Sequence, residues 1–325
     1  MSSLKKRIKN NPIGRYVVER RKSERAYRTY QKKSDIDQIR ETYFRETGRE
    51  PNLSDPKRYT EKLQWLKLFW RDEKATICAN KYTVKGYLTD LGYGYLLNET
   101  IAYYTDVKQI NIAELPNKFV LKGTHGSGWN LIVRDKNKIN WSAWKMVMKC
   151  WLKQDLTWYG REWVYHDQPH GIIVEKYLED DSGELRDFKI ICTNGIPQFM
   201  QIDENRQTNH KRIYVDRDGN EIPMDDNQES RHPTITFGEN QREMFRLAEE
   251  LSKPFPNVRI DFYECNGRIY FGEFTFFGGS GYYSFEPDEW DVHWGSRLIL
   301  PPANYNLDLY GELCDEYKET ERSIH

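Results

Sequence analysis

The 325-residue chain carries 49 Lys and Arg against 50 Asp and Glu, and this formal net charge of −1 argues against a nucleic-acid-binding protein. No apolar run approaches the roughly 20 residues needed to cross a bilayer, and the N-terminus lacks the apolar core of a signal peptide. The five cysteines are scattered without a CxxC pair, which is typical of reduced cytoplasmic thiols rather than of a disulfide framework or a zinc site.

Residues 1–33 form a strongly basic segment in which twelve Lys and Arg stand against only Glu19 and Glu24. One interpretation is a basic amphipathic segment that lies on an anionic membrane. The other is a helical arm that packs on its own domain or on a second copy of the chain. The sequence leaves both interpretations open.

Residues 34–75 are predicted to be helical, with Thr60 as the cap of one helix. Another helix is predicted from Asn80 to about residue 90. It puts Lys81 and Lys85 one turn apart on one face. Either lysine can be an ordinary exposed residue or a contact for a phosphate group.

A strand, a glycine-rich loop and a second strand are predicted between residues 117 and 134. Two runs of β-branched and aromatic residues, 119–121 and 131–133, flank the sequence GTHGSG at 123–128. Three glycines in six residues permit positive φ, and successive N–H groups in such a loop can form a concave anion site. Lys122 adds a point charge at the end of the first strand. The pattern indicates a phosphate-cradling loop, with an ordinary turn as the alternative.

Aromatic residues gather in the segment that follows. A helix over 141–154 presents several of them on one core-facing side. Trp158 and Tyr159 lie outside that helix in a polar context. They fit either a platform for a sugar ring or a local packing cluster.

The second half of the chain is rich in predicted strands. A strand over 171–178 is followed by a hairpin around Asn194-Gly195, and an amphipathic helix covers 240–253. A second hairpin over 258–281 embeds Asp261 and Glu273 in apolar strands. Acidic residues are depleted there, so the pair indicates a partner, and Mg²⁺ with its preference for oxygen ligands is the natural one. Between the hairpins, residues 203–235 are polar, and the basic residues Arg206, Lys211 and Arg212 suit an acidic substrate.

Taken in order, these features resemble the ATP-grasp superfamily, and within it the TupA-like branch named for teichuronopeptide biosynthesis. The resemblance covers roughly residues 58–300. The matching positions are Lys81, Lys122, Glu175-Lys176-Tyr177-Leu178, Asp187-Phe188-Lys189, Arg259-Ile260-Asp261, Glu273-Phe274-Thr275 and Gly278-Gly279-Ser280-Gly281. Thr275 stands where the family has Asn.

The resemblance implies an α+β, ATP-grasp fold, in which two α+β subdomains grip ATP between antiparallel sheets, with a helical N-terminal region. It implies ATP and Mg²⁺ as cofactors. The residues that it assigns to ATP are Lys81, Lys122, Gly126, Ser127, Gly128, Glu175, Lys176, Tyr177, Leu178, Asp187 and Lys189. The residues that it assigns to the metal are Asp261, Glu273 and Thr275. Arg259 and Lys122 are the expected catalytic residues. The expected regions are a basic arm and helical region (1–78), a lid (79–178), a C-terminal subdomain with the metal site (179–300) and a charged tail (301–325).

The implied activity is that of an ADP-forming carboxylate–amine ligase working through an acyl phosphate. The branch suggests a uronic acid of a capsule or teichuronic-type surface polysaccharide as the acidic glycan, joined to an amino acid or another amine. The alternatives are an ATP-grasp kinase for a glycan or small molecule, and a glycosyltransferase using Asp216-Arg217-Asp218 as a DxD motif. The expected location is the cytoplasm, at the inner face of the membrane if residues 1–33 bind lipid.

Overall fold

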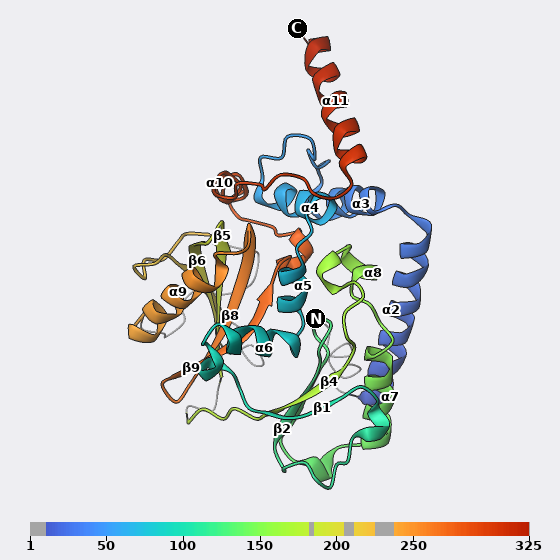
Figure 1. The fold of residues 1–325 in the computed structure, drawn as a ribbon, viewed down its shortest axis with the longest axis vertical. Coiled ribbons are helices and arrows are strands. Elements are labelled where there is room, and N and C mark those ends of the chain that lie inside the picture. Colours follow the sequence, from blue (N-terminus) through green and yellow to red (C-terminus); the bar gives the residue numbers. More distant parts are fainter. Residues whose placement is uncertain (1–10, 182–184, 205–210, 225–236, 325) are drawn as a thin grey trace. The chain divides into compact units, whose positions relative to one another are not determined.

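The computed structural model describes residues 11–181, 185–204, 211–224 and 237–324. The chain forms two compact units, and Figure 1 labels their elements where there is room. Unit 1 comprises Met1–Ser34 and Thr76–Leu178, and unit 2 comprises Asp35–Ala75 and Glu179–His325. The region expected over 1–78 is therefore divided, because its basic arm belongs with the lid segment and its helical part belongs with the C-terminal segment.

Unit 1 contains a four-stranded antiparallel sheet with the strand order β1-β4-β2-β3. The strands are β1 (Thr100–Tyr104), β2 (Phe119–Gly123), β3 (Asn130–Val133) and β4 (Ile172–Lys176). The helices are α2 (Pro12–Lys32), α6 (Thr83–Asp90), α7 (Trp141–Trp151) and α8 (Thr157–Gly160), and α5 (Glu73–Ala79) leads into the unit. The predicted strand–loop–strand is confirmed, since β2 and β3 pair directly with Phe119 opposite Val133.

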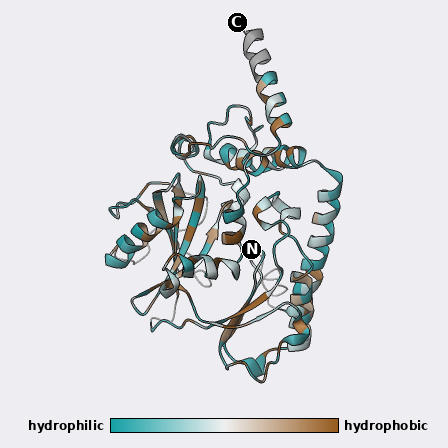
Figure 2. Ribbon diagram, in the orientation of Figure 1, coloured by the Kyte–Doolittle hydropathy of each residue, from teal (hydrophilic) through white to brown (hydrophobic). Residues whose placement is uncertain are grey.

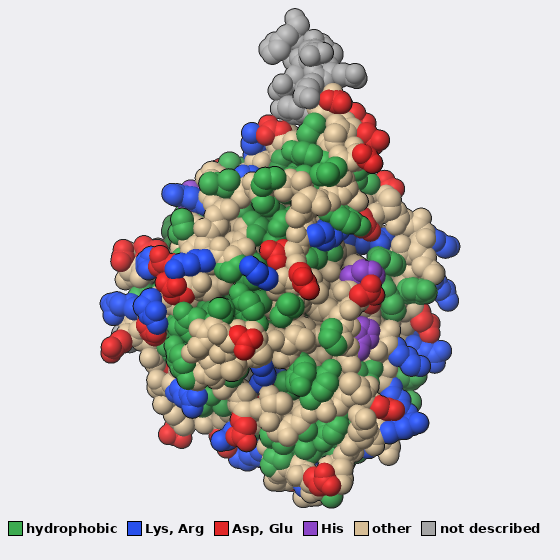
Figure 3. All heavy atoms as spheres, in the orientation of Figure 1, with side chains coloured by type: hydrophobic (Ala, Val, Ile, Leu, Met, Phe, Trp, Pro, Cys, Tyr) green, Lys and Arg blue, Asp and Glu red, His purple; other side chains and the backbone are tan. Residues whose placement is uncertain are grey.

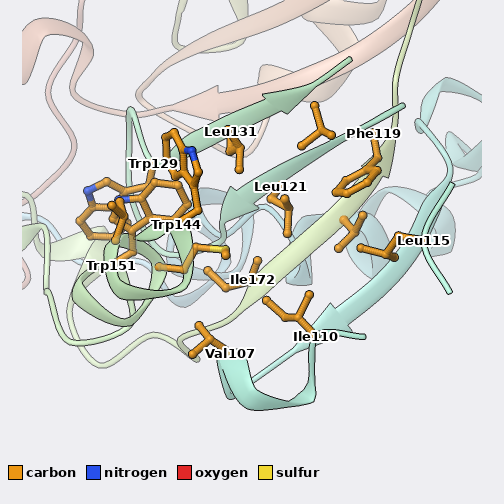
Figure 4. Close-up of a cluster of buried hydrophobic side chains, with 14 residues drawn as sticks. Val107, Ile110, Leu115, Phe119, Leu121, Trp129, Leu131, Trp144, Trp151 and Ile172 are labelled. Atoms are coloured by element: carbon orange, nitrogen blue, oxygen red, sulfur yellow. The ribbon is translucent and has the colours of Figure 1, made fainter. Parts of the chain in front are cut away.

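The core of unit 1 lies between its sheet and α7 (Figure 4). Alternate residues of β2, Phe119 and Leu121, are buried there, as the period of a strand requires. The predicted apolar side of α7 supplies Trp144, Val147, Met148 and Trp151. Burying side chains of this size stabilises the unit by about 1.5–3 kcal/mol each.

The described part of the basic arm is the helix α2, which packs against α7 and α8. Asn11 caps its first turn by accepting a hydrogen bond from the Ile13 N–H at 3.0 Å. α2 buries no residue completely, and Figure 2 colours it mostly hydrophilic. Trp158 packs against the ring of Tyr27 at a centroid distance of 4.7 Å. The structure therefore supports the packing interpretation, both for this helix and for the aromatic cluster.

Unit 2 contains a five-stranded antiparallel sheet with the order β7-β6-β5-β8-β9. The strands are β5 (Arg186–Thr193), β6 (Ile196–Glu204), β7 (Lys211–Val215), β8 (Asn257–Cys265) and β9 (Arg268–Thr275). The helices are α3 (Asp35–Thr47), α4 (Tyr59–Phe69), α9 (Glu239–Ser252), α10 (Glu289–Arg297) and α11 (Leu307–Ile324), and the short 3₁₀ turn η5 spans Gly278–Gly281.

The two faces of this sheet differ in chemistry. One face is apolar and contacts α9, whose Met244, Leu247 and Leu251 are buried. Asp187, Lys189, Arg259 and Asp261 alternate with this apolar set, and they point to the opposite face because side chains two apart share a side. The candidate site residues of unit 2 lie on that polar face.

Two Asn-Gly turns set the strand register, as predicted. Asn194 and Gly195 have φ of 51° and 78°, and Asn266 and Gly267 have φ of 50° and 75°. Such consecutive left-handed residues suit the tight hairpin turns that asparagine and glycine favour.

The predicted helix cap at Thr60 is wrong. Helix α4 begins one residue earlier, at Tyr59, and other groups accept the hydrogen bonds of its N-terminal N–H groups. The Glu61 carboxylate accepts hydrogen bonds from the Lys57 and Arg58 N–H groups, both at 3.0 Å. The Thr60 hydroxyl instead donates to Asp291 at 2.7 Å. A sequence pattern cannot anticipate this capture, because Asp291 lies far along the chain.

The surface charges, the cysteines and the helices of the structure can be compared with the composition of the chain. Charged side chains of both signs are interspersed on the face drawn in Figure 3. All five cysteines are free thiols. Within the described residues, no helix combines the length and the apolarity that a membrane span requires.

Candidate functional site

The side chain of Trp129, at the end of the glycine-rich loop of unit 1, packs against that loop. A Cβ atom added to Gly126 would lie 2.4 Å from the Trp129 side chain, so only glycine fits this position. Gly128 has a φ of 74°, which glycine adopts without strain. The Nζ of Lys81 donates to the Gly126 carbonyl at 2.8 Å. The structure thus brings Lys81 and the loop together, and their role in binding phosphate stays a prediction.

The imidazole of His125 supports the same loop from inside the unit. It stacks on His170 at a centroid distance of 3.8 Å, and its Nε2 lies 3.1 Å from the Trp151 carbonyl oxygen. Burial lowers the pKa of His125 to about 3, so the ring is neutral at physiological pH. His125 is a structural support for the loop.

Beside the loop, two lysines share one carboxylate. Glu175 lies 2.7 Å from the Nζ of Lys122 and 2.6 Å from the Nζ of Lys85. Burial alone would raise the pKa of Glu175, but Lys122 and Lys85 outweigh it and hold the pKa at about 2. Sequence reasoning left Lys85 undecided, and its pairing with Glu175 gives it a position in this charge cluster.

Lys176, Tyr177 and Leu178, which the resemblance also assigns to ATP, are more exposed than Glu175. The Nζ of Lys176 lies 3.7 Å from Glu99, and the Tyr177 hydroxyl accepts a hydrogen bond from Arg134 at 3.3 Å. Leu178 is the last residue of unit 1. The assignment of residues 175–178 to ATP stays a prediction.

In unit 2, Arg259, Asp261, Glu273 and Thr275 meet on the polar face of adjacent strands. Asp261 lies opposite Glu273, and Arg259 lies opposite Thr275. The Arg259 guanidinium donates to both oxygens of Asp261, at 2.6 and 2.7 Å. It lies 3.6 Å from Glu273 and donates to the Thr275 hydroxyl at 3.1 Å. Four predicted site residues therefore form one cluster.

The chemistry of this donor set fits Mg²⁺. It offers two carboxylates and a hydroxyl, and Mg²⁺ takes oxygen ligands while keeping waters and substrate phosphates as the rest of its shell. Burial and the nearby carboxylate of Glu273 raise the pKa of Asp261, although Arg259 opposes this shift. The set contains two carboxylates. Across the part of the chain that the structure describes, no group of three or more His, Cys, Asp or Glu side chains is found that could hold a metal ion by itself.

A β-bulge shapes the cluster. The register shifts between Asp261 and Phe262, which leaves Gly272 as the extra residue of β9. A Cβ atom on Gly272 would lie 2.9 Å from the Asp261 carbonyl oxygen. Glycine at this position therefore lets Glu273 approach Asp261.

A second charge network lies on the same face. The Lys189 ammonium lies 2.5 Å from both Asp187 and Asp203, and Arg212 donates to Asp203 at 2.7 Å. Because Lys189 pairs with Asp261 across β5 and β8, the two networks are neighbours on one sheet. Burial would raise the pKa of Asp203, but Lys189 and Arg212 hold it well below its usual range.

Sequence reasoning missed Asp203, although an acidic residue at the end of an apolar strand is a usable signal. It also proposed a basic clamp from 203–235. Of that set, Arg212 binds Asp203, whereas Arg206 and the side chain of Lys211 lie outside the described residues.

The glycine-rich turn η5 is held by helix α4 of the same unit. Gly279, Ser280 and Gly281 have φ of 55°, 55° and 72°. The Nζ of Lys67 donates to the Ser280 carbonyl at 2.7 Å, and the Gln64 amide donates to the Gly281 carbonyl at 2.9 Å. Sequence reasoning did not single out these two residues. Their signal is a polar pair three residues apart within the apolar run 63–69 of the helix.

Comparisons with known proteins place the chain in a family. A family model described as TupA-like ATPgrasp matches residues 61–299. No curated protein matches the sequence significantly.

Several solved structures are similar at low identity. D-alanine–D-alanine ligase from Bacillus anthracis is 18% identical, over 75% of this chain and 70% of that one, with a TM-score of 0.40. The same ligase complexed with ATP is 16% identical, over 75% and 68%, with a TM-score of 0.39. The ATP-grasp ligase PsnB complexed with minimal precursor, Mg and ADP is 12% identical, over 79% and 64%, with a TM-score of 0.36. Similarities this distant say nothing about substrates.

The family match covers well over half of the chain and includes the glycine-rich loop, both charge clusters and the turn η5. The two antiparallel sheets agree with the ATP-grasp fold that the motifs predict. The chain belongs to the TupA-like ATP-grasp family.

Proposed function

We propose that this chain is an ADP-forming carboxylate–amine ligase that joins an amine to an acidic substrate through an acyl phosphate. Membership of the ATP-grasp family makes ATP, with Mg²⁺, its cofactor. The observation that carries the proposal is the cluster in which the Arg259 guanidinium lies between the carboxylates of Asp261 and Glu273.

The charges of this cluster suit the proposed reaction. One guanidinium and two carboxylates sum to one negative charge, so a bound divalent cation would turn the cluster net positive. Mg²⁺ held by Asp261 and Glu273 would neutralise charge on the phosphates of ATP. Arg259 would then be released in part from Asp261 to stabilise negative charge that develops on the substrate. This is the role proposed for it as a catalytic residue.

The residues of unit 1 supply the phosphate contacts in this proposal. Lys81 and Lys122, with the N–H groups of Gly126, Ser127 and Gly128, would bind the polyphosphate. Lys122 is 24% exposed and is hydrogen-bonded to Glu175. Because Lys85 also contacts Glu175, it can keep that carboxylate neutralised when Lys122 turns to a phosphate. Asp187 and Lys189 are proposed as nucleotide contacts in unit 2.

The chemistry needs no covalent enzyme intermediate. An oxygen of the substrate carboxylate attacks the γ-phosphorus, and the bond from that phosphorus to ADP breaks. The amine nitrogen then attacks the acyl carbon, phosphate leaves, and the nitrogen loses a proton to give the amide. We propose a uronic acid of a surface polysaccharide as the carboxylate, on the basis of the family name and its resemblance alone.

The glycosyltransferase alternative has little support in the structure. The carboxylate of Asp216 accepts hydrogen bonds from the Asp218 and Asn220 N–H groups at 2.9 and 2.8 Å. Arg217 forms an ion pair with Glu249. The DxD residues therefore shape their own turn.

The test measures ADP release with a uronic-acid glycan and with the same glycan after carboxyl reduction. We expect release only with the carboxylate, and hydroxylamine should trap a hydroxamate when the amine is withheld. Equal release from the reduced glycan, with phosphate found on a hydroxyl of the product, would instead identify a kinase. In that case the nucleotide assignment survives and the ligase proposal fails.

We also propose peripheral contact with an anionic membrane through the outer side of α2. Arg21, Arg25 and Arg28 are exposed there, and Val17 is 40% exposed. Co-sedimentation with vesicles containing phosphatidylglycerol should fall when these three basic residues are replaced by Gln. Unchanged co-sedimentation would refute the contact.

A further inference from the structure

We propose that Arg15, on the N-terminal helix α2, is a positioning residue that holds the phosphate-binding loop in its binding conformation. The inference rests on the proposed nucleotide role of that loop. Arg15 and α2 lie outside residues 61–299, the part of the chain that matches the family. The family assignment therefore says nothing about this contact.

The guanidinium of Arg15 contacts the loop directly. Its Nη2 donates to the Gly128 carbonyl at 2.9 Å, and its Nη1 donates to the Asn130 carbonyl at 3.2 Å. These carbonyls flank Trp129, whose side chain packs under Gly126. The loop is thus held by Trp129 from inside the unit and by Arg15 from α2.

The position of Arg15 is itself fixed. Its Nε donates to Glu19 at 2.6 Å, and the other oxygen of Glu19 accepts from the Trp151 indole at 2.6 Å. The guanidinium also lies 5.2 and 5.3 Å from the ring centroids of Trp144 and Trp151. The carbonyl of Trp151 is also hydrogen-bonded to His125 of the loop. The buried Trp151 therefore links two supports of the loop, Arg15 (through Glu19) and His125.

These contacts have a physical consequence for phosphate binding. A carbonyl and the following N–H lie in one peptide plane and point in opposite directions. Holding the Gly128 carbonyl therefore fixes the direction of the Trp129 N–H. The positive guanidinium also offsets the partial negative charge of two carbonyl oxygens, which would otherwise repel a polyphosphate.

A second arginine on the same helix provides a matched control. Arg20 forms the same kind of pair with Glu24, at 2.8 Å and four residues apart, but its side chain is 61% exposed, whereas that of Arg15 is 18% exposed. Arg15→Met and Arg20→Met therefore remove the same group from one helix. Arg15→Lys keeps the charge but cannot donate to both carbonyls and to Glu19 in the same planar arrangement.

The first measurement is hydrogen exchange of the full chain without nucleotide. We expect Arg15→Met to speed exchange of the amides at 123–130 by about tenfold or more, the effect of losing a charged hydrogen bond. Exchange in β4 should stay as in the wild type, and Arg20→Met should change nothing. The exchange rate of the loop amides in Arg15→Lys should lie between those of the wild type and Arg15→Met.

The second measurement is calorimetric binding of ATP and AMP. Arg15→Met should weaken ATP binding by about tenfold and leave AMP within about twofold, because AMP lacks the polyphosphate that the loop is proposed to bind. Loop exchange and ATP affinity equal to those of Arg20→Met would overturn the proposal. So would an equal loss of ATP and AMP affinity, or faster exchange throughout unit 1 without an excess at the loop. A wild-type protein that binds neither nucleotide would refute the proposed function and the phosphate-binding purpose of the contact, whereas loop exchange would still report whether Arg15 holds the loop.

Discussion

Replacing Glu175 by Gln tests the charge cluster beside the phosphate loop. The substitution keeps the size of the side chain but leaves Lys122 and Lys85 facing a neutral amide. Glu175 lies 2.7 and 2.6 Å from the two ammonium groups, and its side chain is 9% exposed. Solvent screening is therefore weak, and the pKa of this carboxyl reports its contribution to stability.

The magnitude follows from that pKa. Its ordinary value is 4.5, and the lysines hold it at about 2 against the effect of burial. At about 1.4 kcal/mol per pH unit, this difference corresponds to roughly 3 kcal/mol of folding free energy. Because the folded-state pKa is the lower one, the contribution is complete above pH 4.5 and is lost as the pH falls towards 2. Wild type and Glu175→Gln should therefore differ at pH 7 and converge near pH 2.

The assay is urea unfolding at several pH values between 7 and 2.5. Unfolding is monitored through hydrogen exchange in peptides from β2 and β4. The control is Glu99→Gln, because Glu99 pairs with Lys176 at 3.7 Å and is 66% exposed. Exposed pairs of this kind contribute about 0–1 kcal/mol. A loss below about 1 kcal/mol for Glu175→Gln at pH 7, or a loss that does not depend on pH, would refute the reasoning.

Three further substitutions test other parts of the site. Glu273→Gln should abolish ADP release without changing the urea midpoint, since it removes one proposed metal ligand at constant volume; near-normal ATP consumption would show that the metal assignment is wrong. Lys122→Ala should weaken ATP binding by about 1.5–3 kcal/mol, roughly ten- to a hundredfold, because a phosphate loses its cationic partner. Unchanged affinity in calorimetry would contradict this. Lys67→Met should destabilise unit 2 by about 1–3 kcal/mol in urea unfolding, because the buried Lys67 ammonium donates to the Ser280 carbonyl. A variant as stable as the wild type would exclude that role.

Local features were readable from the sequence because local rules govern them. Asn194-Gly195 and Asn266-Gly267 predict tight hairpins, since these residues tolerate positive φ. The second hairpin, with its alternation of polar and apolar residues, sets Asp261 beside Glu273. The glycine-rich loop and its preceding Lys122 were recognisable for the same reason, and the order of such motifs along the chain pointed to the family.

Contacts between distant segments were not readable, because they depend on which elements pack together. Arg15 contacts Gly128 from more than a hundred residues away, and Lys67 contacts Ser280 across a still longer separation. In the sequence, each is one basic residue among 49. Burial and distance separate them from exposed neighbours such as Arg20. The tertiary structure thus selects which charges support the site, since a charge acts strongly only where packing removes water and supplies a partner.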